Sequence, residues 1–159
     1  MTALAALGSL LRTDQLITGP EQLRTYECDG LTGRRVVPAL VALPETAEEV
    51  AAVVRACHEH GIAFVARGAG SGLSGGALPV ADGIVISLAR MTRILEVDVD
   101  RGLVVVEPGV TNLDVTRAVA AQGFYYAPDP SSQQVCTIGG NVAENSGGAH
   151  CLKYGLSRT

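Results

Sequence analysis

Residues 67–76 read Arg-Gly-Ala-Gly-Ser-Gly-Leu-Ser-Gly-Gly and directly follow the apolar run 62–66. Glycine has no Cβ, so a ligand can approach the backbone N–H groups closely. Successive exposed N–H groups form a concave nest that suits a pyrophosphate. Ser71 and Ser74 add hydroxyl donors, and Arg67 adds either a positive charge or a structural ion pair. We predict a phosphate-binding loop rather than a flexible glycine-serine linker, because both flanks are hydrophobic.

The same loop excludes two common nucleotide-binding folds. Gly70, Gly72 and Gly75 match the pattern G-x-G-x-x-G, but a Rossmann fingerprint must open a helix. Residues 77–83 contain a proline and an Asp-Gly pair, which leaves no room for a helix before the next apolar run. A Walker loop is also excluded, because the only lysine is Lys153. A helix directly after the loop would restore the rival interpretation, an NAD-binding Rossmann domain.

The residues around the loop predict a βαβ unit. Three apolar runs are expected to form buried strands: 39–43, 62–66 and 84–88. Between the first two, Thr46 is expected to cap a helix over 46–60, with Glu49 completing a capping box and Gly61 ending the helix. A strand, a helix and a strand in about 30 residues predict a parallel pair of strands.

The pattern changes after residue 90. Residues 95–99 alternate apolar and acidic side chains, which is typical of a half-exposed strand. A three-residue hairpin loop over 100–102 leads into a second strand at 103–106. A helix is expected over 111–122, capped by a threonine and ended by a glycine. The chain is therefore expected to be α+β, with two small subdomains that meet near 88–93.

The remaining segments carry weaker signals. Residues 3–12 are expected to form an amphipathic helix rather than a signal peptide, and 14–38 are expected to be mostly loop. A second glycine-rich stretch, 137–148, is interpreted as another loop, preceded by the proline-rich turn 127–132. Two such loops suit a long ligand with phosphates in its middle and a ring at one end.

Composition excludes several classes of protein. The chain has 159 residues, 47% hydrophobic and 18% charged, so it can form a core and is not disordered. A net charge of −4 with one lysine argues against nucleic-acid binding. The four cysteines are too widely spaced for a zinc or iron–sulfur site, so we expect reduced thiols, no metal and a cytoplasmic location. The cysteines are Cys28, Cys57, Cys136 and Cys151.

Several motifs together resemble one family. They are Arg67–Ala77, Val106–Val110, Pro128–Ser132, Ile138–Gly148 and Lys153–Gly155. These stretches resemble the FAD-binding domain of the vanillyl-alcohol oxidase and p-cresol methylhydroxylase superfamily. Tyr26–Leu31 and His150–Leu156 are similar to its glycolate oxidase group. The resemblance implies two α+β subdomains that cradle FAD. It covers residues 25–159, with 1–24 as a lead-in, 39–90 as the first subdomain and 91–159 as the second.

The resemblance also implies which residues contact FAD. The loop that starts at Arg67 would bind the pyrophosphate, and a later turn would lie near the flavin or its ribityl chain. The implied cofactor-binding residues are Arg67, Gly68, Ala69, Gly70, Ser71, Gly72, Leu73, Ser74, Pro108, Gly109, Val110, Pro130, Ser131, Ser132, Thr137, Gly139, Gly140, Asn141, Gly147 and Gly148. Some members of the superfamily attach FAD through a histidine in the first loop. This loop has none, so we expect non-covalent FAD.

The family chemistry is transfer of a hydride from the α-carbon of a 2-hydroxy acid to flavin N5. The resemblance places the base and the carboxylate-binding arginine in a C-terminal cap domain, so no catalytic residue is assigned here. We expect this chain to be the incomplete FAD-binding part of a glycolate oxidase flavin subunit, inactive alone. The implied partners are a flavin-bearing sister subunit and an iron–sulfur subunit, and association with the inner face of a membrane would come through them. The alternatives are a D-lactate or D-2-hydroxyglutarate dehydrogenase, or a non-catalytic flavin-binding module.

Overall fold

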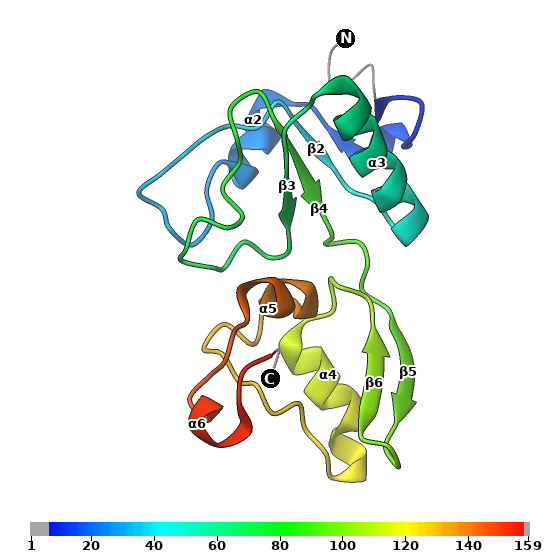
Figure 1. The fold of residues 1–159 in the computed structure, drawn as a ribbon, viewed down its shortest axis with the longest axis vertical. Coiled ribbons are helices and arrows are strands. Elements are labelled where there is room, and N and C mark those ends of the chain that lie inside the picture. Colours follow the sequence, from blue (N-terminus) through cyan, green and yellow to red (C-terminus); the bar gives the residue numbers. More distant parts are fainter. Residues whose placement is uncertain (1–6, 158–159) are drawn as a thin grey trace. The chain divides into compact units, whose positions relative to one another are not determined.

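The computed structural model describes residues 7–157, and the chain divides into two compact units, Met1–Arg90 and Met91–Thr159. Figure 1 shows a mixed sheet with one long helix in the first unit, and a hairpin with shorter helices in the second. Within residues 7–157, no helix is both long and apolar enough to cross a membrane. The mixture of a parallel and an antiparallel sheet confirms the predicted fold class.

The first unit is built on a four-stranded sheet in the order β1-β2-β4-β3. Its strands are β1 (Leu16–Ile17), β2 (Leu40–Ala42), β3 (Phe64–Arg67) and β4 (Ile84–Ser87). β1 is antiparallel to β2, whereas β2 and β3 are each parallel to β4. The predicted parallel βαβ connection is present, but its two strands do not pair directly, because β4 lies between them.

Helix α3 (Ala47–His60) has the predicted ends. The Thr46 hydroxyl accepts a hydrogen bond from the backbone N–H of Glu49, and Gly61 closes the helix at φ 63°. A glycine adopts this left-handed conformation without the steric cost that a Cβ would bring. The threonine cap and the terminal glycine therefore set the two ends of the helix.

The predicted capping box is wrong in one detail. The Glu49 carboxylate does not return to Thr46; its Oε2 accepts from the backbone N–H of Glu45 at 2.7 Å and from Nε2 of Gln15 at 2.7 Å. Gln15 is fully buried, so its amide needs a partner inside the protein. Glu49 supplies that partner and so ties the N-terminal segment to the start of α3.

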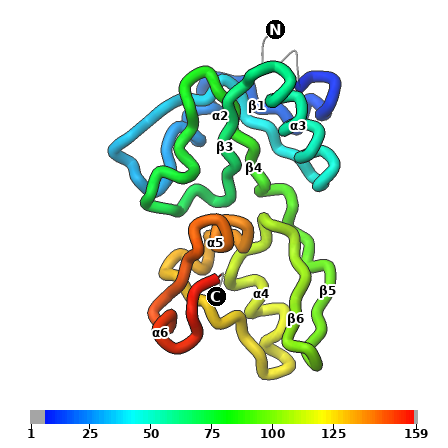
Figure 2. Tube along the Cα trace, viewed as in Figure 1, coloured from blue at the N-terminus to red at the C-terminus, as the bar shows by residue number. Residues whose placement is uncertain are grey.

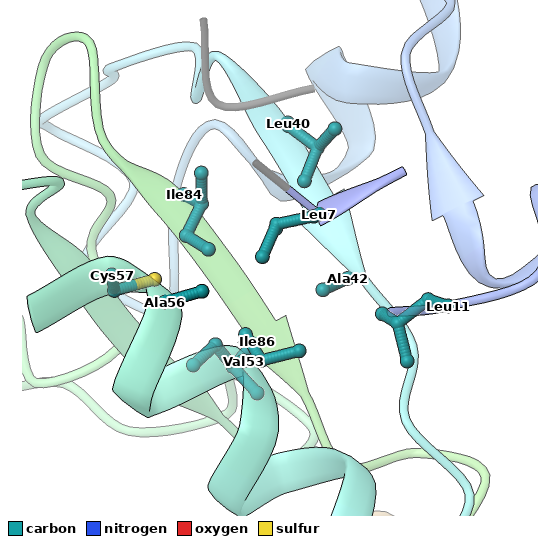
Figure 3. Packing of buried hydrophobic residues seen from close by; sticks show 9 residues of the cluster. All are labelled: Leu7, Leu11, Leu40, Ala42, Val53, Ala56, Cys57, Ile84 and Ile86. Carbon is teal, nitrogen blue, oxygen red and sulfur yellow. The ribbon is translucent and has the colours of Figure 1, made fainter. Parts of the chain in front are cut away.

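The core of the first unit lies on both faces of the sheet, because alternate residues of a strand point to opposite faces. One cluster joins the sheet to α3, as Figure 3 shows. Its buried members are Leu7, Leu11, Leu40, Ala42, Val53, Ala56, Cys57, Ile84 and Ile86. A smaller cluster on the opposite face contains Leu23, Val41, Leu43 and Val85. β3 was expected to be buried, but it is an edge strand whose first residue, Phe64, is 41% exposed.

The N-terminal segment is more ordered than the sequence predicts. Of the expected helix 3–12, residues 3–6 lie outside the described residues, and 8–10 form a turn. The expected loop 14–38 contains β1 and three short helices. These are η1 (Thr13–Gln15), α2 (Pro20–Leu23) and η2 (Arg24–Tyr26). Only the part after residue 26 is the long loop that we expected.

The second unit begins with an antiparallel hairpin, β5 (Ile94–Asp98) and β6 (Leu103–Val106). The turn spans four residues, 99–102, one more than predicted. Helix α4 (Asn112–Val119) continues into η3 (Ala120–Gln122) and ends at a glycine with φ 80°, as expected. The two strands, the helix and its threonine cap are therefore predicted correctly. The prediction that β5 is only half exposed is wrong, since Leu95 is 56% exposed and Val97 40% exposed.

The second glycine-rich stretch is not a loop. Residues Ile138–Glu144 form helix α5, and Cys151–Tyr154 form the single turn α6. The Thr137 hydroxyl caps α5 by accepting from the backbone N–H of Gly140 at 3.4 Å. Two adjacent glycines weaken helix propensity, but the threonine cap and tertiary contacts around the helix prevail over it.

Candidate functional site

The loop after β3 has the properties of an anion nest. No helix follows it before β4, which excludes the Rossmann interpretation. Among residues 7–157, no backbone N–H of 68–76 donates a hydrogen bond to the protein. Free N–H groups in a glycine-rich turn are available to a ligand that carries negative charge. The geometry therefore fits a phosphate group at this loop.

Arg67 holds the two ends of this loop against the rest of the first unit. Its guanidinium Nη1 donates to the carbonyl oxygen of Cys28 at 2.8 Å and of Ala77 at 3.3 Å. The side chain lies over the Tyr26 ring, 5.6 Å from its centroid, and the residue is 8% exposed. Gly70 has φ 70°, and a Cβ there would overlap the guanidinium. The ion pairs found among residues 7–157 do not include Arg67, whose guanidinium instead bonds these two carbonyl oxygens.

The segment 28–30 is a part of this site that sequence reasoning missed. Gly30 packs against the carbonyl oxygens of Ser71 and Gly72, and a Cβ on it would lie 2.6 Å from the latter. Figure 2 shows the two chain segments running side by side in the first unit. The sequence places Asp29 and Gly30 only within the Tyr26–Leu31 resemblance and assigns them no contact, because nothing in the sequence connects them to a loop forty residues later.

In the second unit, two of the predicted binding segments meet. The carbonyl oxygen of Val110 accepts from the N–H of Ile138, and that of Pro108 accepts from the N–H of Gly139, both at 2.9 Å. A Cβ on Gly139 would lie 2.7 Å from the Pro108 side chain. The start of α5 therefore rests directly on the 108–110 turn.

The other two predicted segments of this unit also meet. Gly148 lies so close to the backbone of Asp129 that a Cβ would overlap it. The Asp129 carboxylate bonds Nδ1 of His150 at 2.5 Å and accepts from the backbone N–H of His150 at 3.3 Å. The hydrogen bond from His150 lowers the pKa of Asp129 below its usual value. This pair fixes the turn before Ser131 against the turn that carries the Gly147-Gly148 pair.

The second unit offers one further unpaired donor. Asn141 is 3% exposed, yet its Nδ2 has no partner among the described residues. A buried amide donor is costly unless it is hydrogen-bonded. This donor can therefore form a hydrogen bond to an oxygen atom of a ligand.

An apolar cavity of about 300 Å³ lies elsewhere in the second unit, between the β5–β6 hairpin, α4 and residues 124–126. None of the predicted cofactor-binding residues lines it. The cavity is therefore separate from the candidate site.

A family model described as an FAD binding domain matches residues 38–159. The chain belongs to this FAD-binding domain family. The match confirms the resemblance and identifies FAD as the cofactor of the domain. Its limits include β2 through α6, so both units of the chain belong to the FAD-binding domain.

The FAD-binding domain has relatives among flavoenzymes. It is 50% identical over 143 residues to glycolate oxidase subunit GlcD of Escherichia coli, covering 90% of this chain and 29% of the relative. It is 40% identical over 121 residues to D-lactate dehydrogenase of Anaerostipes hadrus, covering 76% of this chain and 25% of the relative. The chain thus spans less than a third of the length of these relatives.

Solved structures agree on the fold. Alkyldihydroxyacetonephosphate synthase superposes with a TM-score of 0.86 at 25% identity, over 97% of this chain and 31% of that one. p-Cresol methylhydroxylase superposes with a TM-score of 0.79 at 23% identity, over 91% of this chain and 29% of that one. The second of these confirms the superfamily fold that the motifs predict.

Proposed function

We propose that this chain is the FAD-binding part of a flavoprotein that oxidises 2-hydroxy acids, most similar to a glycolate oxidase subunit. The observation that carries the proposal is the loop 68–76, whose N–H groups are free and whose last neighbour, Ala77, is held by the Arg67 guanidinium. The identity to GlcD supports glycolate as the substrate. Similarity to a D-lactate dehydrogenase and to a D-2-hydroxyglutarate dehydrogenase keeps those two activities as the alternatives.

We assign the residues as follows. Arg67 and the amides of 68–74 bind the pyrophosphate without a covalent bond to the cofactor. Residues 108–110, 130–132 and the start of α5 line the remainder of FAD. When bound, FAD supplies the redox chemistry by accepting at N5 the hydride from the α-carbon of the substrate. The full set of proposed contacts is Arg67, Gly68, Ala69, Gly70, Ser71, Gly72, Leu73, Ser74, Pro108, Gly109, Val110, Pro130, Ser131, Ser132, Thr137, Gly139, Gly140, Asn141, Gly147 and Gly148.

In this proposal the residues of this chain bind and orient FAD, and the catalytic base is not among them. We place the base and the carboxylate-binding arginine in the part of the relatives' length that this chain does not span. The E. coli relative is by its name a subunit of glycolate oxidase. By the same likeness, we propose a flavin-bearing sister subunit and an iron–sulfur subunit as partners, in the cytoplasm or at the inner face of the membrane.

Titration of the purified chain with FAD tests the cofactor assignment. We expect quenching of flavin fluorescence at one FAD per chain, and full recovery of FAD in the supernatant after acid precipitation, since the bond is non-covalent. NAD⁺ is the comparison ligand and should not compete. If FAD fluorescence stays unquenched, or NAD⁺ displaces FAD, the assignment is wrong.

Dye reduction tests the substrate class. We expect no glycolate-dependent dye reduction by residues 1–159 loaded with FAD, and turnover by a protein extended to the full length of the glycolate oxidase relative. Turnover by the short chain would refute the placement of the base outside it. A higher kcat/KM for D-lactate or D-2-hydroxyglutarate than for glycolate in the extended protein would favour the alternative substrates. Absence of turnover with all three acids would favour a flavin-binding module.

A further inference from the structure

Asp29 carries an unsatisfied carboxylate inside the first unit. The residue is 5% exposed. Its Oδ1 accepts from the backbone N–H of Leu31 at 2.9 Å, whereas its Oδ2 is buried and has no partner among the described residues. Burial of a carboxylate oxygen without a donor costs free energy that a hydrogen bond would recover. A residue with this cost needs an explanation in terms of a missing donor.

Both neighbours of Asp29 in the chain contact the glycine loop. The carbonyl oxygen of Cys28 accepts from Nη1 of Arg67 at 2.8 Å. Gly30 packs against the carbonyl oxygens of Ser71 and Gly72, with no space for a Cβ. Asp29 is thus fixed at the loop on both sides, although its own Oδ2 bonds nothing there.

The glycine loop and Asp29 suit different parts of one ligand. The free N–H groups of 68–76 and the Arg67 guanidinium are donors and suit phosphate oxygens. An ionised carboxylate only accepts hydrogen bonds, so Asp29 repels a phosphate and needs a donor instead. The groups next to the pyrophosphate of a flavin dinucleotide are sugar and ribityl chains, which carry hydroxyl donors.

We propose that Asp29 is a further binding residue of this site, whose Oδ2 accepts a hydrogen bond from a hydroxyl group of the bound dinucleotide. The inference rests on the proposed binding of FAD at the loop. It adds a residue to which the resemblance assigns no contact with FAD, and it assigns Asp29 the hydroxyl-bearing part of the ligand rather than the phosphates.

The variant Asp29→Asn tests the proposal, because it keeps the shape of the side chain and removes the charge. A lost hydrogen bond to a charged group should raise the Kd for FAD by about 10- to 100-fold. Inorganic pyrophosphate is the second probe, measured by its competition with FAD. It has no sugar hydroxyl, so Asp29→Asn should leave its affinity unchanged or increase it by removing a like charge.

The matched control is Asp82→Asn, which removes the same charge from an exposed position of the same unit. Asp82 has φ 60°, which asparagine also tolerates. The control should bind FAD like the unmodified chain. Equal FAD affinity of Asp29→Asn and Asp82→Asn would overturn the inference, and so would a parallel loss of FAD and pyrophosphate binding, which indicates a structural role.

A ligand-side measurement keeps the test independent of folding. The unmodified chain is titrated with FAD analogues that each lack one hydroxyl group of the ribose or of the ribityl chain. One analogue should bind about 10-fold more weakly than FAD or worse. If every analogue binds like FAD, the inference is wrong while the proposed FAD binding stands. If FAD itself does not bind, the proposed function fails first.

Discussion

The substitution Gly70→Ala probes the link between the glycine loop and Arg67. Gly70 has φ 70°, and alanine in the left-handed region costs about 1–2 kcal/mol. The new Cβ would also overlap the Arg67 guanidinium, which must then leave the carbonyl oxygens of Cys28 and Ala77. Each such bond from a charged donor contributes about 1.5–3 kcal/mol. The two effects together predict that the free energy of unfolding falls by about 4–8 kcal/mol.

The control variant Gly75→Ala separates these effects. Gly75 has φ 79°, but nothing lies within 4 Å of a Cβ placed there. Gly75→Ala should therefore lower the free energy of unfolding only by the cost of the left-handed backbone, about 1–2 kcal/mol. Urea unfolding followed by circular dichroism measures both losses, and FAD titration measures the effect on the site. We expect at least a tenfold higher Kd for Gly70→Ala than for Gly75→Ala, about 1.4 kcal/mol. If the two variants match in stability and in Kd, Arg67 does not hold the loop.

Three further predictions concern stability. Thr46→Ala should lower the free energy of unfolding, measured in urea, by about 1 kcal/mol, because the hydroxyl that caps α3 is lost. Thr46→Ser keeps a capping hydroxyl and should retain the stability of the unmodified chain. Ile86→Ala should lower the free energy of unfolding by about 2–5 kcal/mol, because it leaves a cavity under α3, and the thermal midpoint should fall accordingly. A loss below about 1 kcal/mol would contradict the packing of Ile86 against α3. The hydrogen bonds from Arg93 lower the pKa of Glu107 below its usual value, so the pair stabilises the fold above the usual glutamate range, and this stability is lost as the pH falls through the folded pKa. Glu107→Gln should thus lower the thermal midpoint at neutral pH, and the difference from the unmodified chain should shrink as the pH is lowered through the acidic range. A difference that does not change with pH would contradict the ion pair.

The elements that the sequence predicts correctly are those specified by local signals. The apolar runs at β2 and β4 are fully buried strands, and the Thr46 and Gly61 signals delimit α3. Gly123 likewise ends its helix in the left-handed conformation. In each case a side chain or a backbone preference acts within a few residues, so the local sequence pattern is sufficient to predict the element or its end.

The predictions that fail depend on contacts between distant residues. β3 follows an apolar run like that of β4, yet it lies at the sheet edge, because the position of a strand in a sheet is not encoded in its own residues. The α5 helix was hidden by its two glycines, although Thr137 at its start is a recognisable cap. Asp29 could not be found at all, since its burial arises from a loop forty residues later. Local composition thus predicts whether a segment is a helix or a strand better than it predicts which other segments it contacts.

The two glycine-rich stretches serve different physical purposes, which sharpens the expected position of the phosphates. In 68–76 the N–H groups are free, whereas in α5 the N–H of Gly139 is bonded to Pro108 and that of Gly140 to Thr137. An N–H that already bonds the protein offers little to an anion. The glycines of the second stretch allow close packing against Pro108 and Asp129 instead. The two glycines of α5 therefore serve packing rather than anion binding, and we expect a phosphate group at the first loop, where the N–H groups of 68–76 are free.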